Sequence, residues 1–363
     1  MSISSIQAGL YRIPLPVTLS DSTHGEMTNF ELITVRLETN SGEEGVGFTY
    51  TTGMGGAAIL SLIERELTPV LLDSEEDRIE GLWETMWWRL HYVGRGGLAV
   101  FAISAIDIAL WDLKARRENK PLWRLLGGHD PRVLAYIGGI DLHFTLEELQ
   151  RQTAMNLETG FKAIKMKVGL PRLREDLDRV AAIREVIGEN IPLMVDANMQ
   201  WSVEEAIRAS RSLVEYNVFW LEEPTIPDDV PGHVRIAREG QLPIATGENM
   251  HTLYEFRRMI EAGGVSFPEP DVSNCGGITV WLKVAHVAEA HNLPVTSHGV
   301  HDLHVHLLAA VPNASYLEVH GFGLERFITH ALTIEDGMAI APDRPGHGVN
   351  FDWQALEALR EPT

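Results

Sequence analysis

KAIKMKVGLPRLREDLDRVAAIREVIGENIPLMVDAN, residues 162–198, contains two short apolar runs with an amphipathic helical pattern between them. The first run ends at Lys165-Met166-Lys167 and the second at Asp196, so each run finishes on ionisable side chains. Strand, helix and strand in this order indicate a parallel βαβ unit, because two parallel strands need a crossover connection. The stretch therefore predicts an α/β fold with charged groups at the carboxyl ends of its strands.

The same unit recurs along the chain. The run RVLAYIGG at 132–139 precedes this stretch, and five further runs follow it, which are VFWLEEP, LPIATGE, VSFPEPD, LPVTSHG and SYLEVHG. The later ionisable residues are Glu222, Glu248, Asp271, His298 and Glu318, and successive positions in the series lie 20 to 31 residues apart. Eight runs alternating with helices favour a closed parallel barrel, whose active sites form at the carboxyl ends of the strands. The spacing predicts that these side chains meet in one site.

Two other stretches flank the predicted barrel. Residues 1–130 begin with alternating β segments, joined at the turn Asn40-Ser41-Gly42, and continue with helical patterns, which is typical of a small α+β unit. Residues 131–320 hold the repeated units. Residues 321–363 return to short strands and turns, and we expect them to pack back on the first unit.

Composition excludes several classes of partner. The 363 residues carry 51 acidic and 30 basic side chains, a formal net charge of −21, so nucleic acid and anionic membranes are poor partners. No signal-peptide pattern and no apolar run of membrane-spanning length is present, and we expect a cytoplasmic protein. The single cysteine, Cys275, excludes an internal disulfide framework and is most simply a buried small side chain.

Three acids form the strongest local signal. Asp196, Glu222 and Glu248 end consecutive predicted strands, 26 residues apart in both intervals. One such acid alone is well explained as a cap of the following helix. Three carboxylates in register would repel one another without a cation, and an all-oxygen ligand set suits Mg²⁺ or Mn²⁺ rather than zinc. The sequence therefore predicts a divalent metal site.

Two further groups are candidates for proton transfer. Lys165 and Lys167 share one face of a strand, where mutual repulsion and desolvation would lower one lysine pKa toward neutrality, or they are simply a solvated pair. Asp271 would orient the imidazole of His298 as a general base on an adjacent strand, although a lone histidine is more often structural. A separate metal site is a further alternative for the other histidines nearby, which are His291, His301, His304 and His306.

Taken together, the KxK strand end, the Asp-Glu-Glu series, the Asp271–His298 pair and the final Glu318 resemble the mandelate racemase subgroup of the enolase superfamily. The resemblance covers essentially the whole chain, with seven motifs in order and register. It implies a modified TIM barrel, (β/α)7β, with an N-terminal α+β capping domain completed by the C-terminal segment. It also implies that the three acids bind Mg²⁺.

The resemblance assigns roles to the remaining strand-end residues. Lys167 would be one base, and His298 with Asp271 would be the base on the opposite face. Lys165 and Glu318 would hold the substrate carboxylate and the charge that develops on it, with Glu318 as a hydrogen-bond donor if protonated. Two bases on opposite faces serve either racemisation or elimination.

Substrate contacts are expected from the barrel and from the cap. Asn198 resembles the position that touches a substrate hydroxyl. The loops around Ser20–Glu26, with His24, and Tyr50–Gly56 are expected to close over the ligand, and their polar content suits a polyhydroxylated acid better than an aryl hydroxy acid. Cap segments such as EEGVGFTYTTGMGG are similar to those of acid sugar dehydratases that act on talarate and galactarate.

These inferences define the expected activity. The leading hypothesis is Mg²⁺-dependent abstraction of the α-proton of a carboxylate and dehydration of an acid sugar, an aldarate such as talarate or galactarate or an aldonate, to a 2-keto-3-deoxy acid. The alternative is a racemase or epimerase of a 2-hydroxy acid, and a remote one is a non-catalytic binding or assembly module. A small-molecule carboxylate is the expected partner. The subgroup also implies a homo-oligomer, a dimer or an octamer, although three tryptophans are more simply core than interface: Trp83, Trp87 and Trp88.

Overall fold

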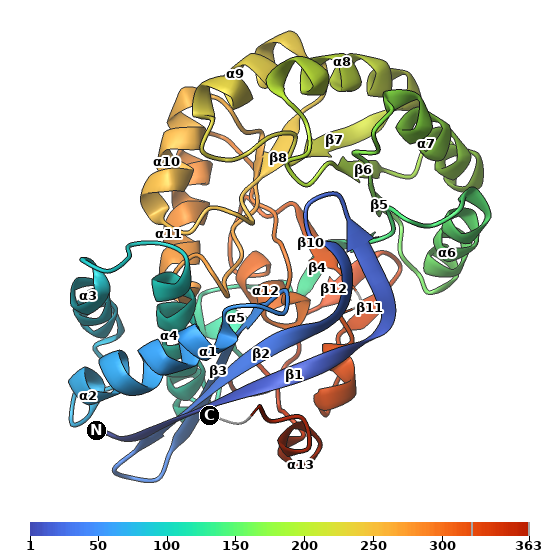
Figure 1. Cartoon of the computed structure of the whole chain (residues 1–363). Coiled ribbons are helices and arrows are strands. Elements are labelled where there is room, and N and C mark those ends of the chain that lie inside the picture. The colour runs from blue at the N-terminus through green and yellow to red at the C-terminus, as the bar shows by residue number, and fades with distance from the viewer. Residues whose placement is uncertain (321, 362–363) are drawn as a thin grey trace.

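A parallel barrel and a smaller antiparallel sheet make up the fold in the computed structural model, which describes residues 1–320 and 322–361 (Figure 1). The barrel strands are β4 (Arg132–Gly138), β5 (Ile164–Lys167), β6 (Leu193–Asp196), β7 (Val218–Glu222), β8 (Ile244–Thr246), β9 (Phe267–Pro268) and β10 (Tyr316–Val319). Neighbouring strands from β4 to β9 pair in parallel, and β10 pairs in parallel with β4, which brings the sheet back to its first strand.

Helices follow the strands and cover the outside of the barrel. They are α6 (Leu146–Glu158), α7 (Leu173–Ile187), α8 (Val203–Leu213), α9 (Val230–Glu239), α10 (Leu253–Ala262), α11 (Gly277–Ala290) and α12 (His301–Leu308). In Figure 1, α6 to α11 form an arc around the strands. A capping box begins α8, since Ser202 and Glu205 each bond the backbone N–H of the other.

The seventh predicted strand, LPVTSHG at 293–299, is not a regular strand. Val295 makes only an isolated parallel bridge with Ala314, and the Thr296 amide donates to the Pro268 carbonyl at 3.0 Å. The segment therefore occupies the position between β9 and β10 without a continuous ladder. It is short because Gly299 takes a φ of 62°, a conformation that turns the chain out of the extended direction.

The cap consists of an antiparallel sheet and the helices that follow it. Its strands are β1 (Ile3–Asp21), β2 (Gly25–Thr39) and β3 (Glu44–Thr51), and its helical segments are α1 (Gly56–Ser61), a π-helical turn (Leu62–Leu67), α2 (Thr68–Leu71), α3 (Ile79–Leu90), α4 (Leu98–Arg117) and α5 (Leu122–Leu125). Helix α4 lies directly against β3, because a Cβ on Gly45 or Gly47 would come within 2.2 or 2.0 Å of the Ala109 or Ala105 carbonyl oxygen. These glycines allow the close packing of helix on sheet.

The β1–β2 hairpin reaches over the mouth of the barrel. At its tip, Ser22 Oγ donates to the Ala197 carbonyl at 2.9 Å, and the Thr23 hydroxyl donates to the Asn198 carbonyl. In Figure 1 this tip lies near the ends of the barrel strands. The hairpin therefore covers the loop that follows β6.

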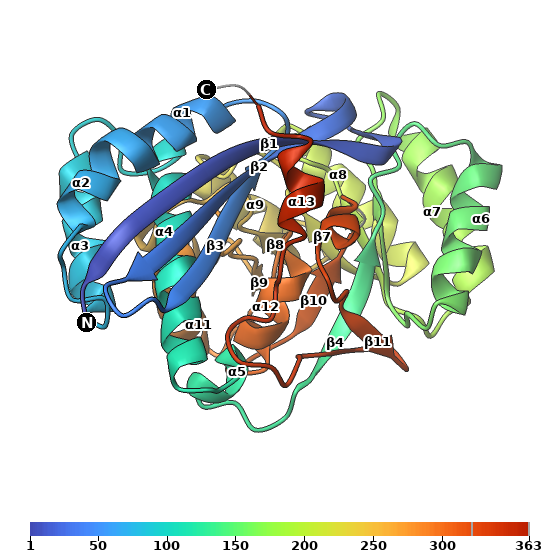
Figure 2. The same ribbon diagram turned by 90° about the horizontal axis from the view of Figure 1, so that it is seen from below.

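The C-terminal segment contacts both the barrel and the cap (Figure 2). It comprises a 3₁₀ turn (Leu324–Phe327), β11 (Thr333–Glu335), β12 (Met338–Ile340) and α13 (Trp353–Glu357). Strand β12 pairs antiparallel with β4, whereas His347 Nε2 donates to the Val46 carbonyl at 2.7 Å and Arg12 Nε donates to Glu361 at 2.8 Å. The division of the chain at residues 130 and 320 stays a prediction.

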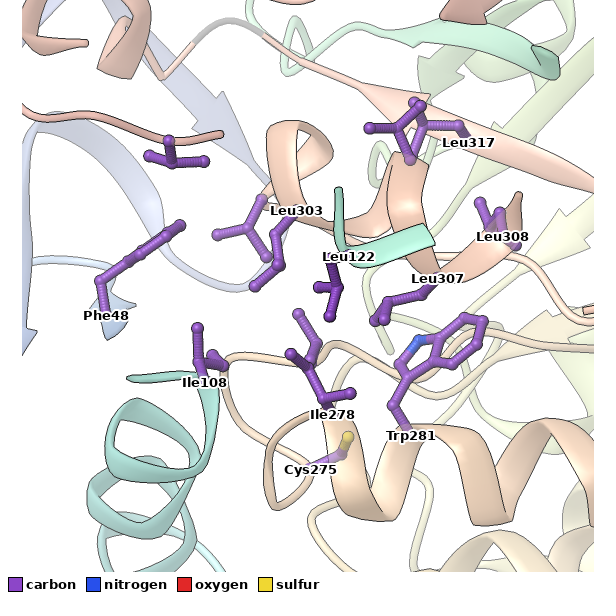
Figure 3. Close-up of a cluster of buried hydrophobic side chains, with 14 of the residues drawn as sticks. Phe48, Ile108, Leu122, Cys275, Ile278, Trp281, Leu303, Leu307, Leu308 and Leu317 are labelled. Carbon is purple, nitrogen blue, oxygen red and sulfur yellow. The ribbon is translucent and has the colours of Figure 1, made fainter. Parts of the chain in front are cut away.

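Cap and barrel share one hydrophobic core. Phe48 of β3 and Ile108 of α4 lie beside Ile278 of α11 and Leu303 of α12 in the same buried cluster (Figure 3). Cys275 belongs to this cluster, as expected for a small buried side chain. Burying each large apolar side chain contributes roughly 1.5–3 kcal/mol, so this shared core holds the cap in one position over the barrel.

One expected core residue lies at the surface. Trp88 on α3 is 58% exposed, while Trp83 and Trp87 are partly buried and stack at 5.3 Å between ring centroids. The prediction that Trp88 belongs to the core was wrong, because Trp88 falls on the outer face of α3. Leu82, Met86 and Leu90 take the buried positions of this helix. Among the described helices, none has both the length and the apolar composition that crossing a bilayer requires.

Candidate active site

Three carboxylates converge at the mouth of the barrel. Asp196 ends β6, Glu222 ends β7 and Glu248 follows β8, and one oxygen of each lies within 4.8 Å of the others. Asp196 Oδ1 accepts the Asn198 amide at 2.9 Å, and Glu222 Oε2 accepts Trp220 Nε1–H at 3.0 Å, which fixes two of the carboxylates. Glu248 Oε2 is buried and has no hydrogen-bond partner among the residues that the structure describes. This oxygen set fits a hard divalent cation.

Two lysines stand on one side of the acids. Lys165 Nζ contacts Glu222, lies 2.6 Å from Glu318 Oε1 and lies 3.6 Å from Asp196 Oδ2. Lys167 Nζ donates to Asp196 Oδ2 at 2.5 Å. The side chains of the two lysines are only 1% and 7% exposed, which excludes the solvated-pair alternative. They share a face of β5, as their spacing predicts.

The expected lowering of a lysine pKa is wrong for this structure. Burial acts to lower the pKa of Lys165, but Glu222 and Glu318 outweigh it and raise that pKa well above its ordinary value. Burial likewise acts to lower the pKa of Lys167, but Asp196, Glu248 and Glu222 together outweigh it, so that pKa is raised. Each ammonium lies within ion-pair distance of a carboxylate, and the argument from repulsion between the lysines left this attraction out. Both lysines are cations in this arrangement.

A histidine–aspartate dyad stands on the other side of the acids. His298 Nδ1 lies 3.1 Å from Asp271 Oδ2, and its Nε2 lies 3.3 Å from Glu248 Oε2. Asp271 Oδ1 accepts from the Ser273 amide at 2.8 Å, which fixes the carboxylate. Burial acts to lower the pKa of His298, but Glu248 and the hydrogen bond to Asp271 outweigh it and raise the pKa to about 10. The imidazole therefore presents Nε2 toward the acid cluster.

Glu318 accepts rather than donates hydrogen bonds. Its Oε1 pairs with Lys165, and its Oε2 accepts the Gly299 amide at 3.0 Å. Burial acts to raise the pKa of Glu318, but Lys165 and His298 together with the other groups nearby outweigh it, and the pKa lies well below its ordinary value. The expected donor role is therefore not what this arrangement supports. The carboxylate joins the lysine side of the site to the loop after His298.

The three expected substrate contacts occupy different places. Asn198, only 3% exposed, has a φ of 41°, and its side-chain oxygen has no hydrogen-bond partner within residues 1–320 and 322–361, so it has an acceptor available beside the acids. His24 lies at the hairpin tip, with Nδ1 2.9 Å from Asp21 Oδ2. Tyr50 donates its hydroxyl to Asp271 at 3.0 Å and lies 3.5 Å from His298 Nδ1, so it contacts the dyad.

Three of the neighbouring histidines hydrogen-bond to backbone groups. His304 Nδ1 donates to the Gly299 carbonyl at 2.8 Å and its Nε2 accepts the Val272 amide at 3.0 Å, while His306 bonds to the backbone of Trp123 and His347. His291 bonds its own helix. In the described part of the chain, the group suited to a metal is the acid triad and includes no histidine. The separate histidine metal site is therefore not supported.

Sequence reasoning missed two groups near the site. Asp141, 1% exposed, accepts the Lys167 amide at 3.2 Å and lies 3.6 Å from Arg179, so it holds the end of β5. His320 follows β10 two residues after Glu318 and is 5% exposed. The period of two along a strand places it on the same side as Glu318, which was the available signal.

Comparison with known proteins agrees with this fold and site. Residues 148–355 match the family model described as Enolase C-terminal domain-like, and residues 7–127 match the Mandelate racemase / muconate lactonizing enzyme, N-terminal domain. The chain belongs to the mandelate racemase subgroup of the enolase superfamily and is an enzyme of that superfamily. The predicted family and fold class are confirmed.

Individual relatives are similar over nearly their whole length. The chain is 55% identical over 357 residues to the 3,6-anhydro-alpha-L-galactonate cycloisomerase of Streptomyces coelicolor, covering 98% of this chain and 99% of the relative. It is 36% identical to the L-talarate/galactarate dehydratase of Salmonella typhimurium, covering 97% and 90%. A solved structure of a racemase from Streptomyces coelicolor A3(2) with bound magnesium has a TM-score of 0.97 at 54% identity, covering 99% of this chain and 100% of that one.

Proposed function

We propose that this enzyme removes the proton next to the carboxylate of a sugar acid and expels the oxygen on the neighbouring carbon, with Mg²⁺ held by Asp196, Glu222 and Glu248. The observation that carries the proposal is the placement of two basic side chains around one acid cluster: Lys167 lies 2.5 Å from Asp196, and His298 lies 3.3 Å from Glu248. A magnesium ion bound there would supply Lewis-acid stabilisation to the substrate carboxylate.

The residues around the acids supply the remaining chemistry. Lys165 places a buried positive charge between Glu222 and Glu318, where it favours negative charge developing on the substrate. Lys167 and His298 hold protons at Nζ and Nε2, and Asp271 keeps the imidazole oriented through Nδ1. In the reactive form one of these two nitrogens has lost its proton and takes the α-proton, and the protonated group on the other side returns a proton to carbon or gives it to the departing oxygen.

Ring opening is the preferred form of this elimination. In a 3,6-anhydro sugar acid the oxygen on C3 belongs to the ring, so elimination breaks the C2–H and C3–O bonds and forms an enol. The ring oxygen takes a proton and becomes a hydroxyl, and the enol becomes a 2-keto-3-deoxy acid with no net loss of atoms. The 55% identity to a cycloisomerase, against 36% to a dehydratase, supports this reaction.

Two enzymatic alternatives use the same groups. With an open-chain aldarate or aldonate the same elimination releases water, which is the dehydration expected from the sequence. With no leaving group on the β-carbon, return of the proton on the other face gives racemisation or epimerisation. A non-catalytic module is not proposed, because the acid triad, both lysines and the dyad are all present.

The test is a set of incubations with Mg²⁺ in D₂O, using a 3,6-anhydro-galactonate, galactonate, galactarate and mandelate. We expect a 2-keto-3-deoxy product of unchanged elemental composition, apart from deuterium, from the anhydro acid, and loss of activity when EDTA removes the metal. A keto product lighter by one water, formed faster from galactarate, would favour dehydration. Deuterium at the α-carbon without a keto product would favour epimerisation, and no α-exchange with any acid would contradict the proposal. The cytoplasmic location and the homo-oligomer stay predictions.

A further inference from the structure

A second pair of histidines lies beside the dyad. His301 begins α12 and His320 directly follows β10, and the His320 ring centroid lies 6.0 Å from that of His298 and 6.3 Å from that of His301. His320 is 5% exposed, yet neither of its ring nitrogens has a hydrogen-bond partner among the described residues, and the same holds for Nδ1 of His301. Three buried or nearly buried ring nitrogens are therefore available for a hydrogen bond.

His304 and His306, which lie three and five residues further along α12, show that the lack of hydrogen-bond partners is confined to His301 and His320 among these histidines. His304 and His306 are fully buried on the same helix as His301, and each bonds backbone groups through both of its ring nitrogens. Buried polar atoms without partners are rare because they lose their hydrogen bonds to water on folding. Open nitrogens on His301 and His320 therefore point to a partner that is not part of the chain.

The surroundings of these nitrogens define the chemistry of that partner. A cavity of about 30 Å³, about the volume of one water molecule, adjoins the pair. Its polar lining residues are the two histidines, Tyr50 and Asp302, and the rest of its lining is apolar. None of the described residues that line it is a lysine or an arginine. Asp302 is 8% exposed and Glu318 lies two residues from His320. Lys165 is already paired with Glu318 and Glu222, so a second carboxylate placed here would meet acids and no free cation.

The His320 ring is uncharged and can still form hydrogen bonds. Burial lowers its pKa to about 3, against the opposing influence of Glu318, so the ring is uncharged at neutral pH. A neutral imidazole presents one donor and one acceptor, which matches a hydroxyl or a hydroxyl next to an ether oxygen. Phe322 packs against the ring at 4.2 Å between centroids, which fixes its orientation.

We propose that His301 and His320 form the subsite for the uncharged distal end of the substrate, its hydroxyls and ring oxygen, and that this subsite selects sugar acids with one carboxylate over aldarates. The inference rests on the proposed function and extends it to the substrate class. Its position fits this role, because His298 lies 3.3 Å from Glu248 of the acid cluster and its ring centroid lies 6.0 Å from that of His320. A sugar acid held by its carboxylate at the metal would then reach this pair past the base.

The experiment compares substrate selectivity in the full-length enzyme loaded with Mg²⁺. Values of kcat/KM are measured for a 3,6-anhydro-galactonate, galactonate and galactarate in the wild type and in His320→Leu, His320→Gln and His301→Leu. We expect the wild type to prefer the two monoacids. Loss of one neutral hydrogen bond to the substrate should lower kcat/KM for the monoacids about tenfold to a hundredfold in His320→Leu, mainly through KM, with partial recovery in His320→Gln.

Controls separate selectivity from folding and from the proposed function. His286→Leu on α11 is the matched control, because that histidine is 63% exposed, and it should leave all three values unchanged. If His320→Leu fails to fold, His320→Gln and His301→Leu carry the test, and thermal melting with Mg²⁺ identifies which variants are folded. An unchanged monoacid-to-diacid ratio in folded His320 and His301 variants would overturn the subsite while leaving the proposed function intact. A wild type without Mg²⁺-dependent activity on any sugar acid would overturn both.

Discussion

The lysine side and the histidine side of the barrel mouth use their buried nitrogens differently. On the lysine side, Lys165 and Lys167 lie within ion-pair distance of carboxylates, and Asp196 is paired with both. On the histidine side, His298 is tied to Asp271 through one nitrogen, while His301 and His320 leave ring nitrogens open. Both sides carry charge, but only the histidine side also has neutral ring nitrogens without partners among the described residues. This difference supports the proposal that the lysine side binds the substrate carboxylate and the histidine side binds the rest of the substrate.

The largest effect is expected from the lysine side. Lys167→Ala should lower kcat toward the upper end of the roughly 10²- to 10⁴-fold range typical of a lost acid–base group, because Lys167 is also the cation closest to Asp196. Steady-state turnover of the sugar acid measures the loss. Lys162→Ala is the control, since Lys162 is 60% exposed and pairs with the surface residue Asp336. Near-normal turnover in Lys167→Ala would remove this lysine from the mechanism.

A somewhat smaller loss, roughly 10²- to 10³-fold, is expected from His298→Asn. Asn cannot act as a base, but Lys167 remains on the opposite side of the acid cluster. Exchange of the α-proton with D₂O should therefore survive for substrates whose C2 configuration faces Lys167, while proton transfer on the histidine face is lost. Proton NMR of the recovered substrate distinguishes the two. Equal loss of exchange for both C2 epimers would contradict the assignment of opposite faces.

Replacing His304 should lower the free energy of unfolding more than replacing His320. His304→Phe would leave the Gly299 carbonyl and the Val272 amide without partners, at about 1–3 kcal/mol for each unsatisfied group. His320→Leu removes no hydrogen bond made within the described chain, so the free energy of unfolding should change little or rise. Denaturant melts of both variants test the contrast. A larger loss in His320→Leu would show that its nitrogens are satisfied in the folded protein.

The smallest effect concerns the hairpin that covers the site. Burial acts to raise the pKa of Asp21, but the hydrogen bonds to His24 and the charge of Lys167 together outweigh it and lower the pKa to about 2. The side-chain hydrogen bond to Asp21 also raises the pKa of His24. Asp21 therefore stabilises the closed hairpin above its unfolded pKa of about 4 and loses this contribution as the pH falls toward 2. His24 contributes fully below about 6.5 and loses its contribution as the pH rises through its raised value.

We therefore expect the substrate KM to rise a few-fold above neutral pH as the hairpin loosens. The KM of His24→Gln should be flat over the same range, because the neutral amide does not titrate. Limited proteolysis within residues 21–25 gives an independent measure of opening. A KM that rises equally in His24→Gln would assign the pH dependence to another group.

The site residues at strand ends were predictable because a parallel barrel imposes a repeat. One strand and one helix occupy a nearly constant length of chain, and the carboxyl ends of parallel strands lie at the same mouth. Asp196, Glu222 and Glu248 therefore had to meet if their runs were strands, and they do. The dyad followed by the same argument, since Asp271 and His298 end neighbouring units.

The irregular features were not predictable in the same way. The segment that carries His298 was expected to be a strand, but its backbone bonds are shared with β9 and with the loop before β10. The predicted lowering of a lysine pKa was also wrong, because distances of a few ångströms to carboxylates on other strands decide the pKa of each lysine. His320 was overlooked, since its role depends on neighbours from α12 and from the cap.

By itself, the sequence determined the barrel, its family and the identity of the groups that gather at its mouth, because strand periodicity and local repeats are properties of neighbouring residues. Only the tertiary structure decided which nitrogens are paired and which stay open. Electrostatic and hydrogen-bond energies depend on separations between atoms far apart in the chain, and those separations are set by the packing of cap on barrel.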